Sequence, residues 1–123
     1  MTKLVQLEFR FSSAHLYHQA LWSLEKNKAE FGLCFSEFGH GHNYKLQVTV
    51  PNSKKALDVR KRIQKVVDSL DHKHLNFELE AFKDQIPTSE MIVLYFSEKL
   101  KDLQPQKIVL FEDDSLGAEI SFY

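Results

Sequence analysis

The sequence predicts an α+β fold in which two strands, two helices and two further strands follow one another along the chain. Apolar and polar residues alternate strictly over residues 5–12 and 43–50, which indicates two strands with one buried face each. Over residues 54–70 the apolar positions instead recur at the spacing of a helix. This β-β-α-α-β-β order is typical of a sheet that carries its helices on one face.

The remaining elements are recognised by their ends. Thr88 is a plausible N-cap for the second helix, and Glu90 places a negative charge in its first turn, where the helix dipole favours it. The last two strands are expected at residues 107–112 and 118–123, with a hairpin loop at 113–117. The connection over residues 16–39 is long, which is usual for functional loops, and it has room for a short helix.

Composition narrows the classes of protein. The 123 residues fit one domain that spans the whole chain, with 43% hydrophobic and 27% charged residues. A net charge of −1 argues against a nucleic-acid binder, and no apolar run is long enough to cross a membrane. The single cysteine, Cys34, cannot form an intrachain disulfide, so we expect a reducing, cytoplasmic location.

Three histidines share one face of the predicted sheet. His40 and His42 continue the buried parity of the second strand, and His15 continues that of the first. If these two strands pair antiparallel, the three side chains meet at one end of the sheet. Three imidazoles with an open fourth position are typical of a catalytic zinc site, although imidazole also suits copper, iron or nickel.

A plainer interpretation of these histidines is also available. A single inward histidine is more often a hydrogen-bonded core residue than a metal ligand. The His40-Gly41-His42 pair is harder to explain in this way, because two buried imidazoles without partners are costly. His18 and His74 show no such pattern, and we interpret them as loop or surface residues.

Other candidates each have a structural and a functional interpretation. Cys34 lies six residues before His40 and is either a thiolate activated near a metal or a small buried hydrophobe. Asp71 followed by His72 is either an oriented base or a charge pair at a helix end. Glu112 ends an otherwise apolar strand, where it either binds a ligand with two adjacent donors or marks the point at which the strand reaches water.

At these residues the chain resembles the 6-pyruvoyl-tetrahydropterin synthase and 6-carboxy-tetrahydropterin synthase family. The resemblance runs from about residue 8 to the end of the chain, and its most specific block is Gly39-His40-Gly41-His42-Asn43-Tyr44 after an upstream cysteine. The other matching segments are Phe11-Ser12-Ser13-Ala14-His15, Leu70-Asp71-His72-Lys73-His74-Leu75-Asn76, Pro87-Thr88-Ser89-Glu90 and Phe111-Glu112.

The resemblance implies the tunnelling fold, with a four-stranded antiparallel sheet and two helices in each subunit. Three such subunits would close a barrel, and two trimers would stack into a hexamer with sites between subunits. The implied activity is a zinc-dependent lyase reaction on 7,8-dihydroneopterin triphosphate that gives 6-pyruvoyl- or 6-carboxy-tetrahydropterin. The resemblance links such products to tetrahydrobiopterin or queuosine biosynthesis.

The resemblance also implies a role for each candidate residue. His15, His40 and His42 would hold the zinc ion, which would act as a Lewis acid on the substrate side chain. The other roles are a proton-abstracting Cys34, a proton relay of Asp71 and His72, a Glu112 that grips the pterin ring, and a pocket lined by Thr88, Ser89 and Glu90.

Two features depart from the family pattern. The stretch over residues 51–59 is short and lacks the usual Gly-Met-Val-X-Asp-Phe segment. Glu37 lies three residues before His40, where one family branch carries a glutamate in place of the cysteine and cleaves the substrate to 6-hydroxymethyl-dihydropterin, a folate precursor. This chain has both Cys34 and Glu37, although Glu37 also fits a solvated loop charge.

Three alternatives therefore accompany the lyase hypothesis. The first is the aldolase-like cleavage that uses Glu37. The second is a non-catalytic paralogue that binds a pterin or a purine, which we would expect to have lost Cys34 or the pair Asp71 and His72. The third is a structural metal module in which Cys34 supplies the fourth ligand that such a site needs.

Overall fold

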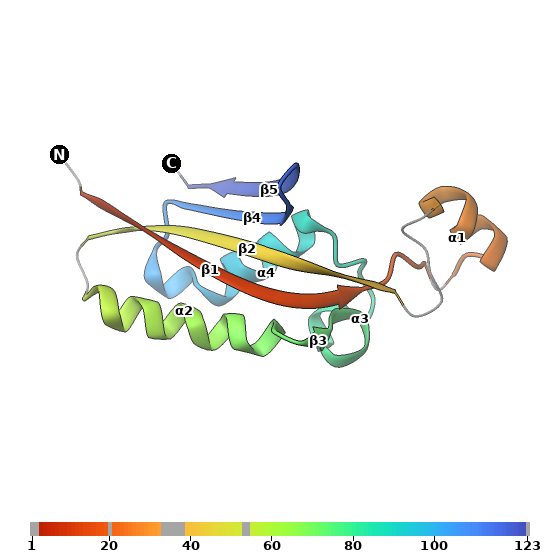
Figure 1. The fold of residues 1–123 in the computed structure, drawn as a ribbon, viewed down its shortest axis with the longest axis horizontal. Helices are drawn as coiled ribbons and strands as arrows, with labels where there is room; N and C mark the ends of the chain where they lie inside the picture. The colour runs from red at the N-terminus through yellow and green to blue at the C-terminus, as the bar shows by residue number, and fades with distance from the viewer. Residues whose placement is uncertain (1–2, 20, 33–38, 53–54, 123) are drawn as a thin grey trace.

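A five-stranded sheet organises the structure, a computed structural model that describes residues 3–19, 21–32, 39–52 and 55–122 (Figure 1). The strand order in the sheet is β3-β1-β2-β4-β5. The strands are β1 (Leu4–His15), β2 (His40–Pro51), β3 (Lys73–His74), β4 (Lys107–Asp113) and β5 (Leu116–Ser121). The predicted α+β class is confirmed.

The prediction of four strands, all antiparallel, is wrong by one short strand. The two residues of β3 pair in parallel with the end of β1. Two anchors on Ser12 hold this segment: its N–H donates to Asp71 Oδ1 at 2.8 Å, and its carbonyl accepts the N–H of His72 at 2.6 Å. A two-residue strand has no alternation of its own, so the sequence pattern could not indicate it.

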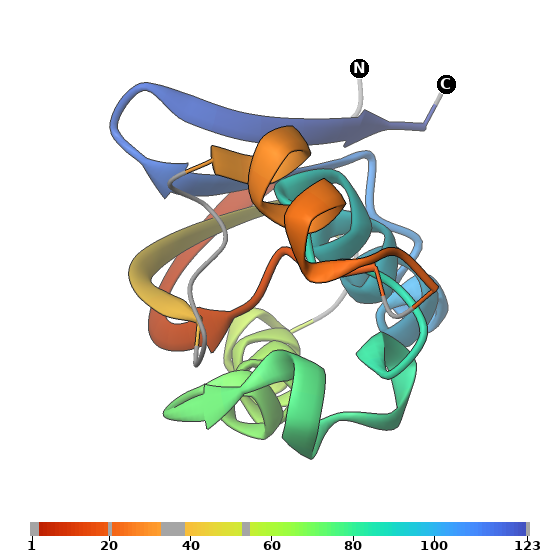
Figure 2. The ribbon, with the colours of Figure 1, turned by 90° about the vertical axis from the view of Figure 1, so that its right-hand side faces the viewer.

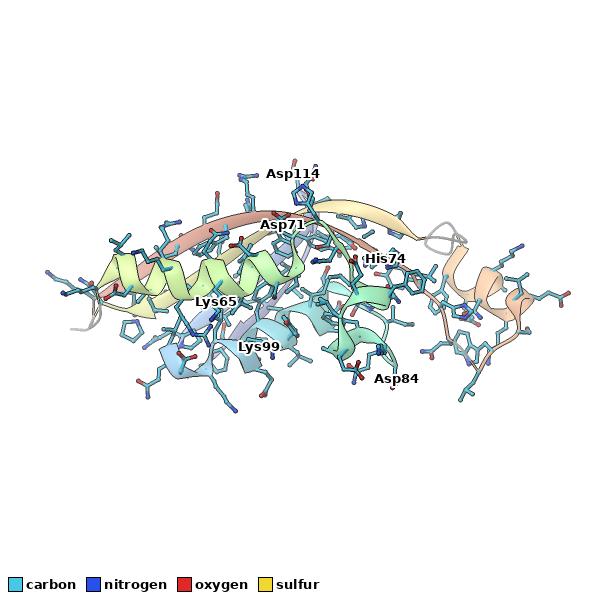
Figure 3. The ribbon with its side chains drawn as sticks, turned by 90° about the horizontal axis from the view of Figure 1, so that it is seen from below. Lys65, Asp71, His74, Asp84, Lys99 and Asp114 are labelled. Carbon is cyan, nitrogen blue, oxygen red and sulfur yellow. The ribbon has the colours of Figure 1, made fainter. Side chains whose placement is uncertain are left out.

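Helices α2 (Ala56–Leu70) and α4 (Ser89–Lys99) cover one face of the sheet, as predicted (Figures 1 and 3). The apolar stripe of α2 is buried against the strands, and Thr88 caps α4 by accepting the N–H of Met91 at 3.2 Å. Within the described residues, no helix is long and apolar enough to cross a membrane. The short helices are α3 (Leu75–Glu78), η2 (Glu80–Phe82) and η3 (Lys101–Leu103).

Helix α1 (Leu24–Phe31) lies within the long connection between β1 and β2 and extends beyond one end of the sheet (Figures 1 and 2). Ser23 caps it by accepting the N–H of Lys26 at 3.1 Å. Asn27 is fully buried, accepts the N–H of Gln19 at 2.7 Å and donates to its carbonyl at 3.1 Å. The short helix that the sequence allowed is therefore present, and Asn27 ties it to the chain that leaves β1.

The pairing of β1 with β2 runs without a shift from Leu4 opposite Pro51 to His15 opposite His40. Alternate side chains of both strands enter the core beneath α2 and α4, with Phe11, Tyr44 and Leu46 among them. The final hairpin is tighter than predicted. Its β4 continues to Asp113, whose Oδ1 accepts the N–H of Ser115 at 2.7 Å and so closes the turn before β5.

Candidate metal centre

The three predicted histidines converge at one end of the sheet. One ring nitrogen of each lies within 4.8 Å of the corresponding atoms of the other two. His15 is the last residue of β1 and is fully buried, while His40 begins β2 opposite it. His42 follows two residues later on the same face. The strand register thus accounts for the whole cluster.

A backbone carbonyl fixes the orientation of His15. Its Nδ1 lies 2.8 Å from the carbonyl oxygen of Pro87, just before α4. Because a carbonyl only accepts, Nδ1 carries the proton and the lone pair is left on Nε2. That Nε2 lies 2.9 Å from Nε2 of His40. A second ring nitrogen held by a carbonyl is the usual arrangement behind a metal-binding histidine.

The residues present fit a metal ion such as zinc. Nitrogen atoms bound tetrahedrally to zinc at about 2.0–2.1 Å lie roughly 3.3 Å apart, close to the separation of the two Nε2 atoms. Nε2 of His42 is buried and has no hydrogen-bond partner in the part of the chain that the structure describes. Buried nitrogens without partners are costly, and a cation that takes up a lone pair removes that cost.

Burial favours the neutral form of His15 and His40, which is the form that can bind a metal ion. Desolvation is the main cause that lowers the pKa of His15 to about 4, and the neighbouring His40 and His42 add to it. Desolvation followed by the charge of His42 also lowers the pKa of His40. Both rings are therefore neutral near pH 7, and protons do not compete for their lone pairs.

Glu112 lies beside the histidines. It is 6% exposed, and its Oε1 is 3.2 Å from Nε2 of His42 and 3.5 Å from Nε2 of His15. Burial is the main cause that raises the pKa of this carboxyl group, and His42 opposes the shift. The alternative that Glu112 merely marks the point at which β4 reaches water is wrong, because the side chain is buried.

Asp71 and His72 form the second polar group of the site. Oδ1 of Asp71 lies 3.0 Å from Nδ1 of His72, whose side chain is 82% exposed. Figure 3 shows Asp71 at the end of α2. His72 and His42 both line a pocket of about 510 Å³ beside β3. The exposed imidazole of His72, which Asp71 orients, therefore lines the same pocket as His42 of the histidine cluster.

The structure describes three of the other predicted residues, Thr88, Ser89 and Glu90, and each has a different environment. The Thr88 hydroxyl is engaged as the cap of α4, whereas Ser89 is buried and its Oγ has no hydrogen-bond partner among the described residues. Glu90 is exposed and close enough to Glu112 to contribute to its raised pKa. Cys34 and Glu37 lie outside the described residues.

Three groups that surround the histidine cluster were not predicted from the sequence. The carbonyl of Pro87 has no sequence signal, because any residue has a carbonyl. The ring centroid of Tyr17 lies 5.0 Å from that of His15 and 6.2 Å from that of His40. His74, which we interpreted as a loop or surface residue, is half-buried in β3 and near enough to lower the pKa of His15. The odd parity that Tyr17 shares with His15 was an available signal.

Comparison with known proteins identifies the family. Residues 4–121 match the family model described as 6-pyruvoyl tetrahydropterin synthase. The chain belongs to this family. The structure also resembles that of the Caenorhabditis elegans 6-pyruvoyl tetrahydropterin synthase, with a TM-score of 0.91 and 28% identity over 100% of this chain and 97% of that one. The predicted tunnelling fold is thereby confirmed.

Two curated relatives carry the names of different enzymes. A putative 6-pyruvoyl tetrahydrobiopterin synthase of Caenorhabditis elegans is 36% identical over 83% of this chain and 79% of its own length. A dihydroneopterin monophosphate aldolase of Pyrococcus furiosus is 30% identical over 68% of this chain and 78% of its own length. The two relatives are thus named for different reactions.

The approach of Gly39 to His15 generates a first prediction. Gly39 has φ of +86°, and a Cβ there would overlap the carbonyl oxygen of His15. We expect Gly39→Ala to lower the free energy of unfolding by at least about 2 kcal/mol more than Gly32→Ala does. Gly32 is the matched control, because it also has a positive φ, of +54°, but open space around its Cβ position. Urea denaturation measures both, and equal losses would show that the contact is unimportant.

Proposed function

We propose that this protein is a zinc-dependent lyase that converts 7,8-dihydroneopterin triphosphate to 6-pyruvoyl- or 6-carboxy-tetrahydropterin. The observation that carries the proposal is the cluster of His15, His40 and His42 at the end of the sheet, in a chain of this family. Zinc bound there would supply a Lewis acid that chelates the side-chain hydroxyls and acidifies the adjacent C–H bonds. The chain itself has to bind the pterin, position the ion and move protons.

Proton transfer is assigned to Cys34, Asp71 and His72. A thiolate near a metal is a suitable base for a C–H bond, and this is the role proposed for Cys34. The carboxylate of Asp71 holds Nδ1 of His72, which supports a relay role because the other ring nitrogen is then the one that exchanges protons. The high exposure of His72 supports its access to an incoming substrate.

Pterin binding is assigned to Glu112, with Thr88, Ser89 and Glu90 around it. A carboxylate accepts two adjacent N–H donors, such as those of a pterin ring. The buried Oγ of Ser89, which has no hydrogen-bond partner within the described residues, could make a further polar contact. Thr88 contributes less directly, because its hydroxyl already accepts the N–H of Met91.

We also propose a homo-oligomer, a hexamer of two stacked trimers. The outer edge of β5 and most of the outer edge of β1 have no partner strand among the described residues, and such edges favour pairing between subunits. Light scattering at micromolar concentration should give a mass several times that of one chain. A monomer under these conditions would contradict the proposal.

A second candidate function is side-chain cleavage to 6-hydroxymethyl-dihydropterin. Two observations favour it: Glu37 precedes His40 in this sequence, and one relative is named as an aldolase acting on dihydroneopterin monophosphate. A carboxylate could remove the proton of a side-chain hydroxyl and so begin a retro-aldol cleavage. Both reactions would use the same histidine cluster.

The metal centre is tested directly by its stoichiometry. We expect one zinc ion per subunit by elemental analysis of metal-replete protein. His42→Ala should lose both the metal and the activity, because two imidazoles no longer fix the geometry of the ion. His18→Ala is the matched control, since His18 is exposed and does not belong to the cluster. A parent protein without stoichiometric metal would contradict the proposal.

The reaction is tested by product analysis with dihydroneopterin triphosphate. Cys34→Ala should abolish the synthase product and spare any 6-hydroxymethyl product, whereas Glu37→Ala should do the reverse. Each variant keeps the three histidines, so each should still bind metal. If Glu37→Ala matches the parent and neither yields 6-hydroxymethyl-dihydropterin, the cleavage activity is excluded and Cys34 is the only base of the pair.

A further inference from the structure

We propose that Glu112 is the fourth protein ligand of the metal when no substrate is bound. This inference rests on the metal centre of the proposed function and goes beyond it. The role assigned to Glu112 above concerns the pterin ring, whereas the structure places this carboxylate against two of the histidines that would hold the ion.

The distances match one coordination shell. In a tetrahedral zinc site with bonds of about 2.0–2.1 Å, neighbouring ligand atoms lie roughly 3.3 Å apart. Nε2 of His15 and Nε2 of His40 are separated by 2.9 Å. Oε1 of Glu112 lies 3.2 Å from Nε2 of His42 and 3.5 Å from Nε2 of His15. The same carboxylate oxygen is thus at ligand-to-ligand distance from two of the three histidines.

The contact between Glu112 and His42 is not explained by a hydrogen bond. Nε2 of His42 is buried and has no hydrogen-bond partner within the described residues, although the carboxylate oxygen is 3.2 Å away. Two electron-rich atoms held this close without a hydrogen bond are unfavourable neighbours when the nitrogen carries no proton. A cation bound by both atoms would make the contact favourable.

The charge of Glu112 is a second reason to assign this residue to the metal. Glu112 is 6% exposed, and a carboxylate so deeply buried needs a positive partner or several donors. Histidines in the neutral form that binds metal bring no positive charge. A divalent cation held by His15, His40 and His42 supplies it, and the carboxylate in turn reduces the net charge that the ion brings into the site.

The geometry of β4 explains why Glu112 is in this position. Ile108, Leu110 and Glu112 alternate with Val109 and Phe111, so the carboxylate is on the same side of the strand as the core residues Ile108 and Leu110. Leu110 pairs with Leu46 of β2, and Tyr44 and His42 follow toward the start of that strand. The same inward parity therefore brings the end of β4 and the start of β2 to the cluster.

The two roles of Glu112 are successive. A catalytic zinc site needs a position for its substrate, whereas a site with four protein ligands is closed. Substrate hydroxyls would displace the carboxylate from the ion, and the released carboxylate would then be free to accept the N–H donors of the pterin ring. Glu112 thereby couples recognition of the ring to opening of the metal site.

Metal affinity tests this assignment without any turnover. Metal-free parent, Glu112→Gln and Asp114→Asn are titrated with zinc in competition with a chromogenic chelator. We expect Glu112→Gln to bind zinc at least about tenfold more weakly than the parent, since even an outer partner of a metal ligand is worth that much. Asp114→Asn removes the same charge from an exposed position in the same hairpin and should bind as the parent does. Equal affinity in all three proteins would overturn the assignment.

The absorption spectrum of the cobalt(II)-substituted parent gives a second test, which depends on no variant. With a carboxylate as fourth ligand, the spectrum should be unchanged between about pH 6 and 9, because the site holds no metal-bound water to ionise near neutral pH. A titration near neutral pH, or a thiolate-to-metal charge-transfer band from Cys34, would overturn the proposal. A parent protein that binds no metal would refute the metal centre itself. A Glu112→Gln variant that binds zinc as tightly as the parent would refute this inference alone.

Discussion

The unbroken antiparallel pairing of β1 with β2 is the constraint on which the rest of the structure depends. It aligns all twelve residues of each strand, from Leu4 with Pro51 to His15 with His40. Side chains on a strand change face at every residue, so a slip of one residue would move one strand's whole inward set to the other face. The apolar residues beneath α2 and α4 oppose such a slip, and the same register sets the histidine cluster. The register that packs the core therefore also brings the three histidines together.

The strands, their pairing and the histidine cluster could be predicted from the alternation of apolar and polar residues alone. The inward parity of His15, His40 and His42 requires only strands and their pairing, and both follow from the sequence pattern. What the pattern missed depends on backbone groups and distant segments. The carbonyl of Pro87 orients His15 across 72 positions of sequence, and every residue offers such an acceptor. Strand β3 is too short to show a period, and the contact of Glu112 with His42 requires the position of β4 in the sheet.

Helix α4 contributes to the site as well as the strands do. Its start is fixed by the Thr88 cap, and the residue before that cap donates no N–H but offers its carbonyl to His15. The family resemblance implied that Thr88 and its neighbours line the substrate pocket. The structure adds an indirect function, since the beginning of α4 determines which nitrogen of His15 carries its lone pair. The cap of α4 and the orientation of His15 thus depend on the same short segment.

The end of β1 makes contacts along both of its edges and on its inward face. This explains how so small a fold holds both the histidine cluster and the pair of Asp71 and His72. One edge of the strand pairs with β2 and brings His15 to His40. The opposite edge pairs only with β3 among the described strands. Near this end, the N–H of Ser12 donates to Asp71, and the carbonyl of Ser12 accepts the N–H of His72. The inward face carries His15 itself. A β-strand offers hydrogen-bonding groups along both edges and side chains on both faces. One strand end can therefore position both a histidine of the cluster and the pair of Asp71 and His72 without a dedicated loop for either.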